Sequence, residues 1–317
     1  MVEVVKIMSG GLSTELETAG LTLQGDPLWS ARLLHTNPQA IKEVHRSFLR
    51  SGAEVLTTAT YQATIKGFQQ HAGLNVEDAE ECLHIGVRLA KEAADEFNWK
   101  SLGKMFWQDK RNILIAGSIG PYGAFLSNGS EYSGYYVKEM STEDLKDWHR
   151  VQMQCLASAG IDFFALETIP SKKEAEALLE VLREFPNTKA WLSYSCQSTT
   201  STSYGDPFEE AVKLAHKSHQ IVAVGANCCS PFLISPLLTC ANKNRKQENG
   251  WIVYPNSGEK WDQESGWHTC NNAEMFCVHA EEWVNLGATW IGGCCRTSPS
   301  AIANLRKILR PFSGNIK

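Results

Sequence analysis

The feature that most constrains the fold is an alternation of short apolar runs with helical patterns, which occurs eight times along the chain. Most of these runs are continuously apolar, as is typical of parallel strands buried on both faces. Such alternation favours either a doubly wound sheet or a closed barrel, and eight repeats favour a single (β/α)8 TIM barrel over residues 1–317. The predicted strands are Val4–Ser9, Val55–Tyr61, Ile113–Ser118, Phe163–Glu167, Ala190–Ser195, Ile221–Ala226, Trp251–Tyr254 and Ala288–Ile291.

Several segments between the strands carry helix signals. Ser141-x-x-Asp144 and Ser171-x-x-Glu174 are typical of capping boxes. Apolar residues recur at helical spacing from Ala79 to Phe97, which predicts one face packed on the sheet. The stretches expected to be irregular are Asn98–Asn112, Ile119–Met140 and Pro255–Asn272. The last two follow the third and seventh strands, so we expect them on the catalytic face of a barrel, where such a loop is a candidate lid.

The bulk composition excludes some classes of partner. A net charge of −5 argues against nucleic-acid binding, and the short basic stretch Lys104–Arg111 is expected to be a solvated loop. Met1–Met8 is too short and too charged for a signal peptide, and no apolar run approaches the ~20 residues of a membrane helix. We therefore expect a cytoplasmic protein whose 10 cysteines are reduced thiols.

Cysteines lie directly after two of the predicted strands. Cys228 and Cys229 follow the sixth strand, and Cys294 and Cys295 follow the eighth behind Gly292-Gly293, a pair expected to supply unusual backbone angles. The ends of these strands can converge on one point of a barrel. Three thiolates suit zinc and leave a fourth position open, as in a catalytic site. Spacing alone leaves two alternatives open, a metal site or a vicinal redox pair of Cys294 with Cys295.

Most of the remaining cysteines are expected to be structural, and three tyrosines are candidates for contact with a cation. Cysteines on helical patterns are expected to be small buried apolar residues, whereas Cys196 and Cys270 are left open. Three tyrosines lie on or after predicted strand ends, where an aromatic face can attract a cation, although ordinary packing is the simpler alternative. The helical cysteines are Cys82, Cys155, Cys240 and Cys277, and the tyrosines are Tyr61, Tyr122 and Tyr132.

At the strand ends and the cysteines that follow them, the chain resembles the homocysteine S-methyltransferase family. The resemblance runs through motifs at Gly10–Glu17, Ser118–Gly123, Glu167–Pro170, Gly225–Cys228, Tyr254–Glu259 and Gly292–Arg296. It implies a barrel with one zinc ion per chain held by Cys228, Cys294 and Cys295, and it selects Cys228 over Cys229. It also implies that Glu167 binds the ammonium of the acceptor. The chain looks closest to the short branch that takes the methyl group from S-methylmethionine, or sometimes S-adenosylmethionine, with selenohomocysteine as another acceptor.

One position departs from the family pattern. Ser9 occupies the place of an acidic residue that helps relatives to hold the substrate ammonium; it can form a hydrogen bond but carries no charge. From the residues themselves, we expect backbone amides at Gly10 and Gly11 to receive the substrate carboxylate. Asn227 is expected to form a hydrogen bond with a ligand sulfur, its alternative role being that of a turn residue.

The resulting hypothesis is that homocysteine binds zinc as a thiolate and attacks the methyl group of a sulfonium donor. The alternatives are a betaine- or corrinoid-dependent methyltransferase acting on a thiol or selenol, and a degenerate barrel that binds zinc or a thiol without turnover.

Overall fold

The computed structural model describes residues 5–102, 112–243, 249–258, 260–262, 266–268 and 275–310. The basic stretch Lys104–Arg111 and Cys270 lie outside these residues.

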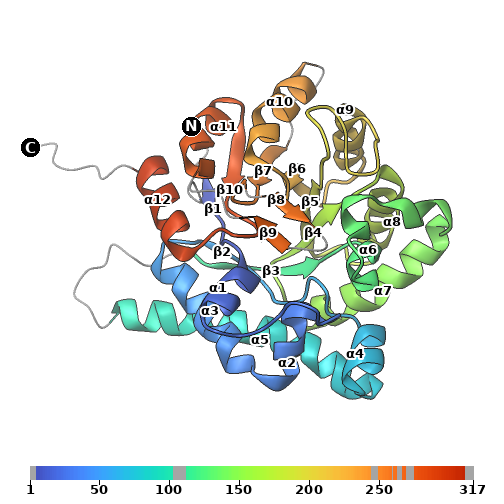
Figure 1. The fold of residues 1–317 in the computed structure, drawn as a ribbon, viewed down its shortest axis with the longest axis vertical. Helices are drawn as coiled ribbons and strands as arrows, with labels where there is room; N and C mark the ends of the chain where they lie inside the picture. The colour runs from blue at the N-terminus through green and yellow to red at the C-terminus, as the bar shows by residue number, and fades with distance from the viewer. Residues whose placement is uncertain are drawn as a thin grey trace, which may run out of the picture.

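Eight parallel strands form the barrel, and each predicted strand overlaps one of them (Figure 1). Every neighbouring pair in this sheet is parallel. A parallel bridge between Met8 and Val55 joins the two outermost strands and closes the circle. The TIM-barrel prediction is therefore confirmed. In sheet order the strands are β1 (Lys6–Ile7), β10 (Ala288–Ile291), β7 (Gly250–Tyr254), β6 (Ile221–Asn227), β5 (Lys189–Tyr194), β4 (Phe163–Ile169), β3 (Leu114–Ile119) and β2 (Val55–Thr57).

Helices surround the strands, as Figure 1 shows. Helix α5 presents the predicted apolar face, with Ala79, Leu83 and Ala90 fully buried. The helices are α1 (Leu12–Thr18), α2 (Arg32–Thr36), α3 (Pro38–Arg50), α4 (Ile65–Ala72), α5 (Val76–Leu102), α6 (Tyr122–Leu126), α7 (Thr142–Ser158), α8 (Lys172–Leu182), α9 (Phe208–Val212), α10 (Pro231–Asn242), α11 (Ala280–Asn285) and α12 (Pro299–Leu309). Short 3-10 helices are η1 (Trp29–Ala31), η3 (Ser130–Tyr132), η4 (Tyr135–Lys138), η5 (Lys213–Lys217) and η6 (Met275–His279).

The inside of the barrel is filled by a second, smaller apolar cluster. All eight strands contribute to it, either directly or, for β1, through the residue that follows. Large rings on β5, β7 and β10 are combined with alanines on β3, β4 and β6, so that the interior is packed rather than hollow. Its members are Met8, Val55, Ala116, Ala165, Trp191, Ala223, Ile252, Tyr254 and Trp290.

The stretches expected to be irregular contain regular structure. Helix α5 continues to Leu102, because Asn98–Leu102 contains no glycine or proline. Strands β8 (Lys260–Asp262) and β9 (Gly266–His268) form an antiparallel hairpin within Pro255–Asn272, each too short for a periodic sequence pattern. The stretch Ile119–Met140 holds α6, η3 and η4.

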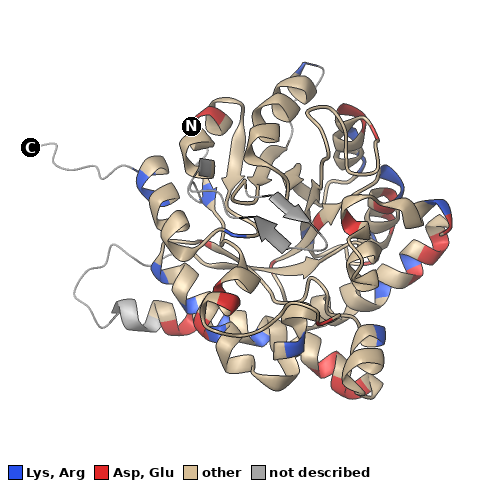
Figure 2. Ribbon diagram, viewed as in Figure 1, with Lys and Arg blue, Asp and Glu red and all other residues tan. Residues whose placement is uncertain are grey.

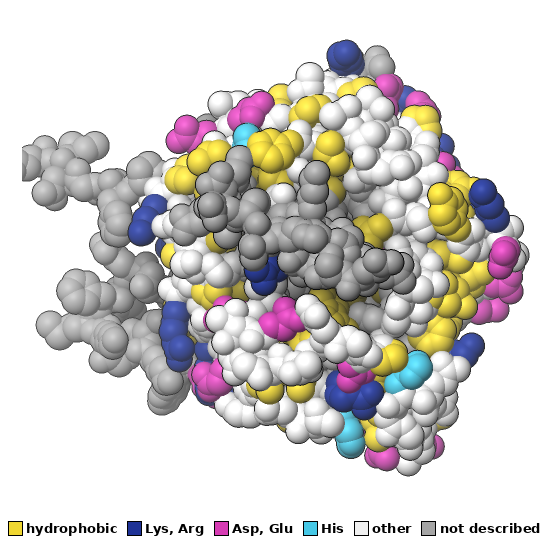
Figure 3. Space-filling view, in the orientation of Figure 1, with side chains coloured by type: hydrophobic (Ala, Val, Ile, Leu, Met, Phe, Trp, Pro, Cys, Tyr) yellow, Lys and Arg dark blue, Asp and Glu magenta, His cyan; other side chains and the backbone are white. Residues whose placement is uncertain are grey.

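Charged residues lie mainly on the outer helices (Figure 2). On the face shown in Figure 3, Lys and Arg are scattered among Asp and Glu. Within the described part of the chain, no helix is long and apolar enough to span a membrane.

A candidate metal centre at the mouth of the barrel

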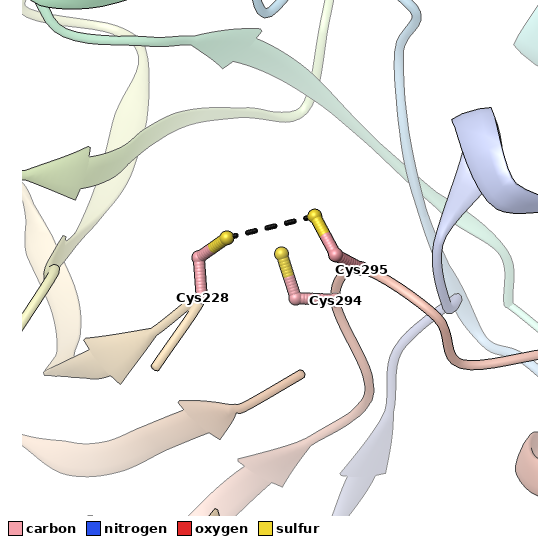
Figure 4. Close-up of side chains that lie close together, drawn as sticks. All are labelled: Cys228, Cys294 and Cys295. Carbon is pink, nitrogen blue, oxygen red and sulfur yellow. Dashed lines mark hydrogen bonds between the residues drawn. The ribbon is translucent and has the colours of Figure 1, made fainter. Parts of the chain in front are cut away.

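Three cysteine side chains meet where β6 and β10 end. The sulfurs of Cys228, Cys294 and Cys295 all lie within 4.8 Å of one another, and the Sγ atoms of Cys228 and Cys295 are 3.7 Å apart (Figure 4). A tetrahedral zinc ion bonded at about 2.3 Å to each sulfur separates the sulfurs by about 3.8 Å. The spacing of the three thiols therefore fits one such ion.

The backbone around the three thiols is tightly held. Cys228 adopts a left-handed conformation with a φ of 49°, and its N–H donates to the Tyr254 carbonyl at 3.2 Å. The N–H of Cys294 donates to the Pro255 carbonyl at 2.8 Å. These bonds join the ends of β6, β7 and β10, so the positions of the sulfurs are set by the barrel itself.

The expectation that Gly292 and Gly293 supply unusual backbone angles is wrong, because neither has a positive φ. They are required for close packing instead. A Cβ on Gly292 would lie 2.5 Å from the Cβ of Met8, and one on Gly293 would lie 2.2 Å from Thr297 Oγ1. Both contacts are far too short, so only glycine lets the turn at Cys294 sit against the end of β1.

The three cysteines would carry three negative charges if all of them were thiolates, and such a cluster needs a cation. Hydrogen bonds from the thiols of Cys294 and Cys295 lower the pKa of Cys228 well below its ordinary value. The hydroxyl of Tyr132 lies 3.1 Å from the Cys228 sulfur and supports the same thiolate. In contrast, the pKa values of Cys294 and Cys295 are raised, because their protons are held in hydrogen bonds with Cys228. All three can be thiolates together only if a cation offsets their charge, so the residues present fit a metal ion.

Glu167 lies inside the same mouth, on β4, and is 8% exposed. Its Oε1 accepts a hydrogen bond from the Ser118 hydroxyl, and the Tyr254 hydroxyl also bonds to this carboxylate. Tyr254 is held in turn by the Trp191 indole, whose Nε1 lies 3.0 Å from the hydroxyl. Burial outweighs these bonds and raises the pKa of Glu167 to about 7. The carboxylate is therefore oriented, and none of the described residues that line the cavity with it is Lys, Arg or His.

The structure gives Asn227 a different contact from the one expected. Asn227 is fully buried, and both ends of its amide bond to Thr168. Its Oδ1 accepts from the Thr168 N–H at 2.7 Å, and its Nδ2 donates to the Thr168 hydroxyl at 2.8 Å. Thr168 has a φ of 60°, which is rare for a β-branched residue and costs free energy. Asn227 therefore clamps the strained residue next to Glu167.

Ser9, Gly10 and Gly11 lie at the mouth beside the cysteines. Ser9 lines the cavity, with its Oγ 3.5 Å from the hydroxyl of Thr57. The N–H of Gly11 already donates to the carbonyl and hydroxyl oxygens of Thr297, at 2.9 and 3.1 Å. A Cβ on Gly11 would lie 2.6 Å from the Cys294 carbonyl oxygen, so this glycine is needed for close approach to the cysteine turn.

A cavity of about 610 Å³ opens over the cysteines, within the range of small-molecule sites. The lining includes Tyr61 and Tyr132, whereas Tyr122 packs outside it against Phe125 and Trp148. Four carboxylates line the cavity, and none of its lining residues, all of them in the described ranges, is Lys, Arg or His. The chemistry of the cavity thus favours cationic ligands. The four acidic residues are Glu17, Asp26, Glu131 and Glu167.

The segment that carries Glu131 and Tyr132 is anchored from below by Glu174. This buried carboxylate accepts from the Tyr122 N–H at 2.7 Å and from the Tyr136 hydroxyl, and it lies 3.0 Å from His149 Nε2. The predicted capping box at Ser171 is consequently only half formed. Ser171 accepts from the Glu174 N–H at 3.3 Å, while the Glu174 carboxylate bonds to Tyr122 and Tyr136 instead of the Ser171 backbone.

Other cysteines lie apart from the three. Cys229 is buried in the main apolar core near Cys196, and burial raises its pKa to about 12. Cys82, Cys155 and Cys277 are buried on their helices, as expected, and Cys240 is half-buried. Every cysteine in the described ranges is a free thiol.

Comparisons with known proteins agree with this geometry. The family model described as homocysteine S-methyltransferase matches residues 6–309. Homocysteine S-methyltransferase 1 of Zea mays is 42% identical over 98% of this chain and 95% of its own. Selenocysteine Se-methyltransferase of Brassica oleracea var. italica is 41% identical over 96% of this chain and 88% of its own. The metallated crystal structure of the homocysteine methyltransferase MmuM from Escherichia coli superposes with a TM-score of 0.83 at 35% identity, covering 95% of each chain.

Proposed function

The chain belongs to the homocysteine S-methyltransferase family, and from that premise we propose that it methylates homocysteine at a zinc ion held by Cys228, Cys294 and Cys295. The activity itself, transfer of a methyl group to homocysteine, follows from the family and from relatives that match nearly the whole chain. The identity of the metal is supported by the three convergent sulfurs, which carry this part of the proposal. A zinc ion there would bind the homocysteine sulfur as a thiolate and keep it nucleophilic at neutral pH.

Glu167 is proposed to bind the ammonium group of homocysteine. Its carboxylate is oriented by Ser118 and Tyr254, faces the cavity and has no basic side chain beside it among the cavity lining. A charge-assisted hydrogen bond to an ammonium contributes about 1.5–3 kcal/mol. Because the carboxylate is already in position, little side-chain entropy is lost on binding.

The methyl donor is proposed to be a sulfonium, S-methylmethionine or S-adenosylmethionine. The sulfur of homocysteine forms a bond to the methyl carbon while the bond from that carbon to the donor sulfur breaks, and the electron pair stays with the departing thioether. A cavity with acidic and aromatic lining and without basic side chains among its described lining favours such a cation. Betaine is also a cation, so comparison of purified donors is needed to separate these cases.

The first experiment measures zinc content and homocysteine-dependent methionine formation from S-methylmethionine in one reduced preparation. About one zinc per chain together with turnover supports both parts of the proposal. Zinc without turnover on any sulfonium donor would reject the donor assignment, and turnover without metal would reject the zinc centre.

A set of cysteine variants tests the ligands. Cys228→Ala, Cys294→Ala and Cys295→Ala are each expected to lose zinc and activity, because two sulfurs do not complete the site. Cys229→Ala is the matched control: it should retain zinc and turnover and lose only about 1 kcal/mol of stability. Loss of zinc in the control would show that Cys228 was wrongly chosen.

A selenol is a second acceptor class, because one relative at 41% identity is named a selenocysteine Se-methyltransferase. Selenols ionise more readily than thiols, so the same centre suits them. Direct competition between homocysteine and selenocysteine for a limiting donor would measure the preference. Preference for the selenol would make homocysteine the secondary acceptor.

A further inference from the structure

Glu131 is a half-buried residue whose carboxylate the proposed roles above do not use. It lies in η3, lines the cavity, and its Oε2 is buried without a hydrogen-bond partner. Its own backbone N–H is the one hydrogen bond that acts on the pKa of this carboxyl. Buried carboxylate oxygens are normally paired, so an unpartnered oxygen on a residue that lines a ligand cavity indicates that the ligand supplies the partner.

The other carboxylates of the cavity are accounted for. Asp26 pairs with Arg32, whose Nη2 lies 3.0 Å from Oδ1. Glu17 is offset by the charge of Arg296. Glu167 is oriented by its hydroxyl partners and is assigned above to the acceptor. Glu131 therefore remains as the one carboxylate of the described lining with neither a cation nor an assigned role.

The position of Glu131 is fixed before any ligand arrives. Its backbone carbonyl accepts from the Ser195 hydroxyl at 3.1 Å, and a Cβ on Gly123 would lie 2.6 Å from its backbone nitrogen. Tyr122 and Tyr136, which lie before and after Glu131 in the chain, both donate hydrogen bonds to Glu174. A carboxylate on a backbone held in this way can bind a cation without first having to order its loop.

Glu131 also lies on the side of the cavity where the three cysteine sulfurs meet. Its neighbour Tyr132 contacts the Cys228 sulfur at 3.1 Å, and Tyr61 lines the same wall. Burial raises the pKa of Glu131 to about 7, and the negative charge of Cys228 adds to this increase. A molecule that contacts Glu131 is therefore placed close to the cysteine centre.

We propose that Glu131 binds the α-ammonium group of the methyl donor, a sulfonium amino acid, in a subsite separate from the one that Glu167 provides for the acceptor. This inference rests on the proposed function. The acceptor and the donor each carry an ammonium group, and the cavity provides two carboxylates without a basic partner, one for each.

The ammonium is a better partner for this carboxylate than the sulfonium. Methyl transfer removes the positive charge of the sulfonium, so a carboxylate beside it would stabilise the ground state more than the transition state and slow the reaction. The charge of the ammonium persists throughout. Pairing it with Glu131 lowers the KM of the donor without a penalty in kcat, and leaves the sulfonium to the aromatic faces of Tyr61 and Tyr132.

The test compares Glu131→Gln with the wild type on two donors. One is S-methylmethionine, and the other is dimethylsulfonioacetate, a sulfonium that has no ammonium group. The matched control is Glu139→Gln, which removes a charge from an exposed position just beyond η4 on the same segment. Binding of S-methylmethionine is also followed by titration calorimetry, a measurement that does not need turnover. Circular dichroism and zinc content report whether each variant is folded and loaded.

In Glu131→Gln we expect the KM and the dissociation constant of S-methylmethionine to rise about 10- to 100-fold, with the KM of homocysteine unchanged. The constants for dimethylsulfonioacetate should not change, and Glu139→Gln should resemble the wild type. An unchanged dissociation constant for S-methylmethionine overturns the inference. So does a rise confined to homocysteine, which would place Glu131 in the acceptor subsite, or an equal rise for both donors, which would place it at the sulfonium.

These outcomes differ from those that would reject the proposed function. Absence of turnover in the wild-type enzyme concerns the function, and calorimetry would then still show whether the sulfonium amino acid binds through Glu131.

Discussion

Removing the Asn227 side chain is expected to loosen the substrate site without removing any group that touches substrate. Asn227→Ala deletes two hydrogen bonds to Thr168, of 2.7 and 2.8 Å, at a fully buried position. The N–H of Thr168 is then left unsatisfied, at about 1–3 kcal/mol, and a neutral hydrogen bond worth about 1 kcal/mol is lost. The free energy of unfolding should therefore fall by about 2–4 kcal/mol.

The same change should act on the acceptor. Thr168 keeps its left-handed backbone, with a φ of 60°, only while the surroundings hold it there. When the clamp is lost, this strain can relax by rotation of the peptide next to Glu167, which moves the carboxylate away from Ser118 and Tyr254. We expect the KM of homocysteine to rise about tenfold, in line with the effect of removing a supporting contact.

Asn242→Ala is the matched control. Asn242 also makes two hydrogen bonds, accepting from Trp251 Nε1 at 2.9 Å and donating to the Leu286 carbonyl at 3.0 Å, but it lies at the far end of α10. Asn242→Ala should lower the free energy of unfolding and leave the KM of homocysteine unchanged. Urea unfolding and initial-rate kinetics measure both quantities. If Asn227→Ala leaves the KM of homocysteine as in the wild type, Asn227 does not hold Glu167 in position and the reasoning is wrong.

Three further predictions concern the same mouth. The pKa of Glu167 is raised to about 7 by burial, so its ionised fraction grows as pH rises through 7. The kcat/KM for homocysteine should therefore rise over the same pH range in the wild type, and this rise should be absent from the pH profile of Glu167→Gln. Ser9→Asp should lower the KM of homocysteine about three- to tenfold, because it adds a charge beside the Thr57 hydroxyl; an unchanged KM would mean that the ammonium lies out of reach. Tyr132→Phe should weaken zinc binding about tenfold by removing the hydrogen bond to the Cys228 sulfur, measured by chelator competition against the wild type; equal affinities would contradict this role.

The sequence was sufficient to predict the barrel, because strands buried on both faces leave continuous apolar runs such as Ile221–Ala226. Strand ends in a barrel share one face, so the convergence of Cys228 with Cys294 and Cys295 followed from their positions. The choice of Cys228 over Cys229 required the family resemblance. The structure supplies a physical basis, since the backbone of Cys228 is left-handed while Cys229 is buried in the core.

Contacts between distant segments were beyond sequence reasoning. Asn227 and Thr168 are 59 positions apart, so nothing local indicated that the amide would bond to both the backbone N–H and the hydroxyl of Thr168. Glu174 fits a capping pattern locally, yet in the fold its carboxylate faces His149, Tyr122 and Tyr136, and tertiary contacts override the local preference. Glu131 lies in a short 3-10 segment without periodicity, where no pattern separates a cavity carboxylate from a solvated one.

The charges of the cavity also bear on product release. Methyl transfer moves a methyl group from a positively charged sulfur to a negatively charged one and leaves two neutral thioethers, so the attraction that brings the two sulfurs together is lost in the reaction. The ammonium groups keep their charges and their carboxylate partners, Glu167 and Glu131 in the proposed assignment. Each product is then held through its ammonium alone, and the sulfur ends are free to leave first. Methionine should accordingly bind more weakly than S-methylmethionine, and Glu131→Gln should reduce that difference little, because the carboxylate contributes equally to both.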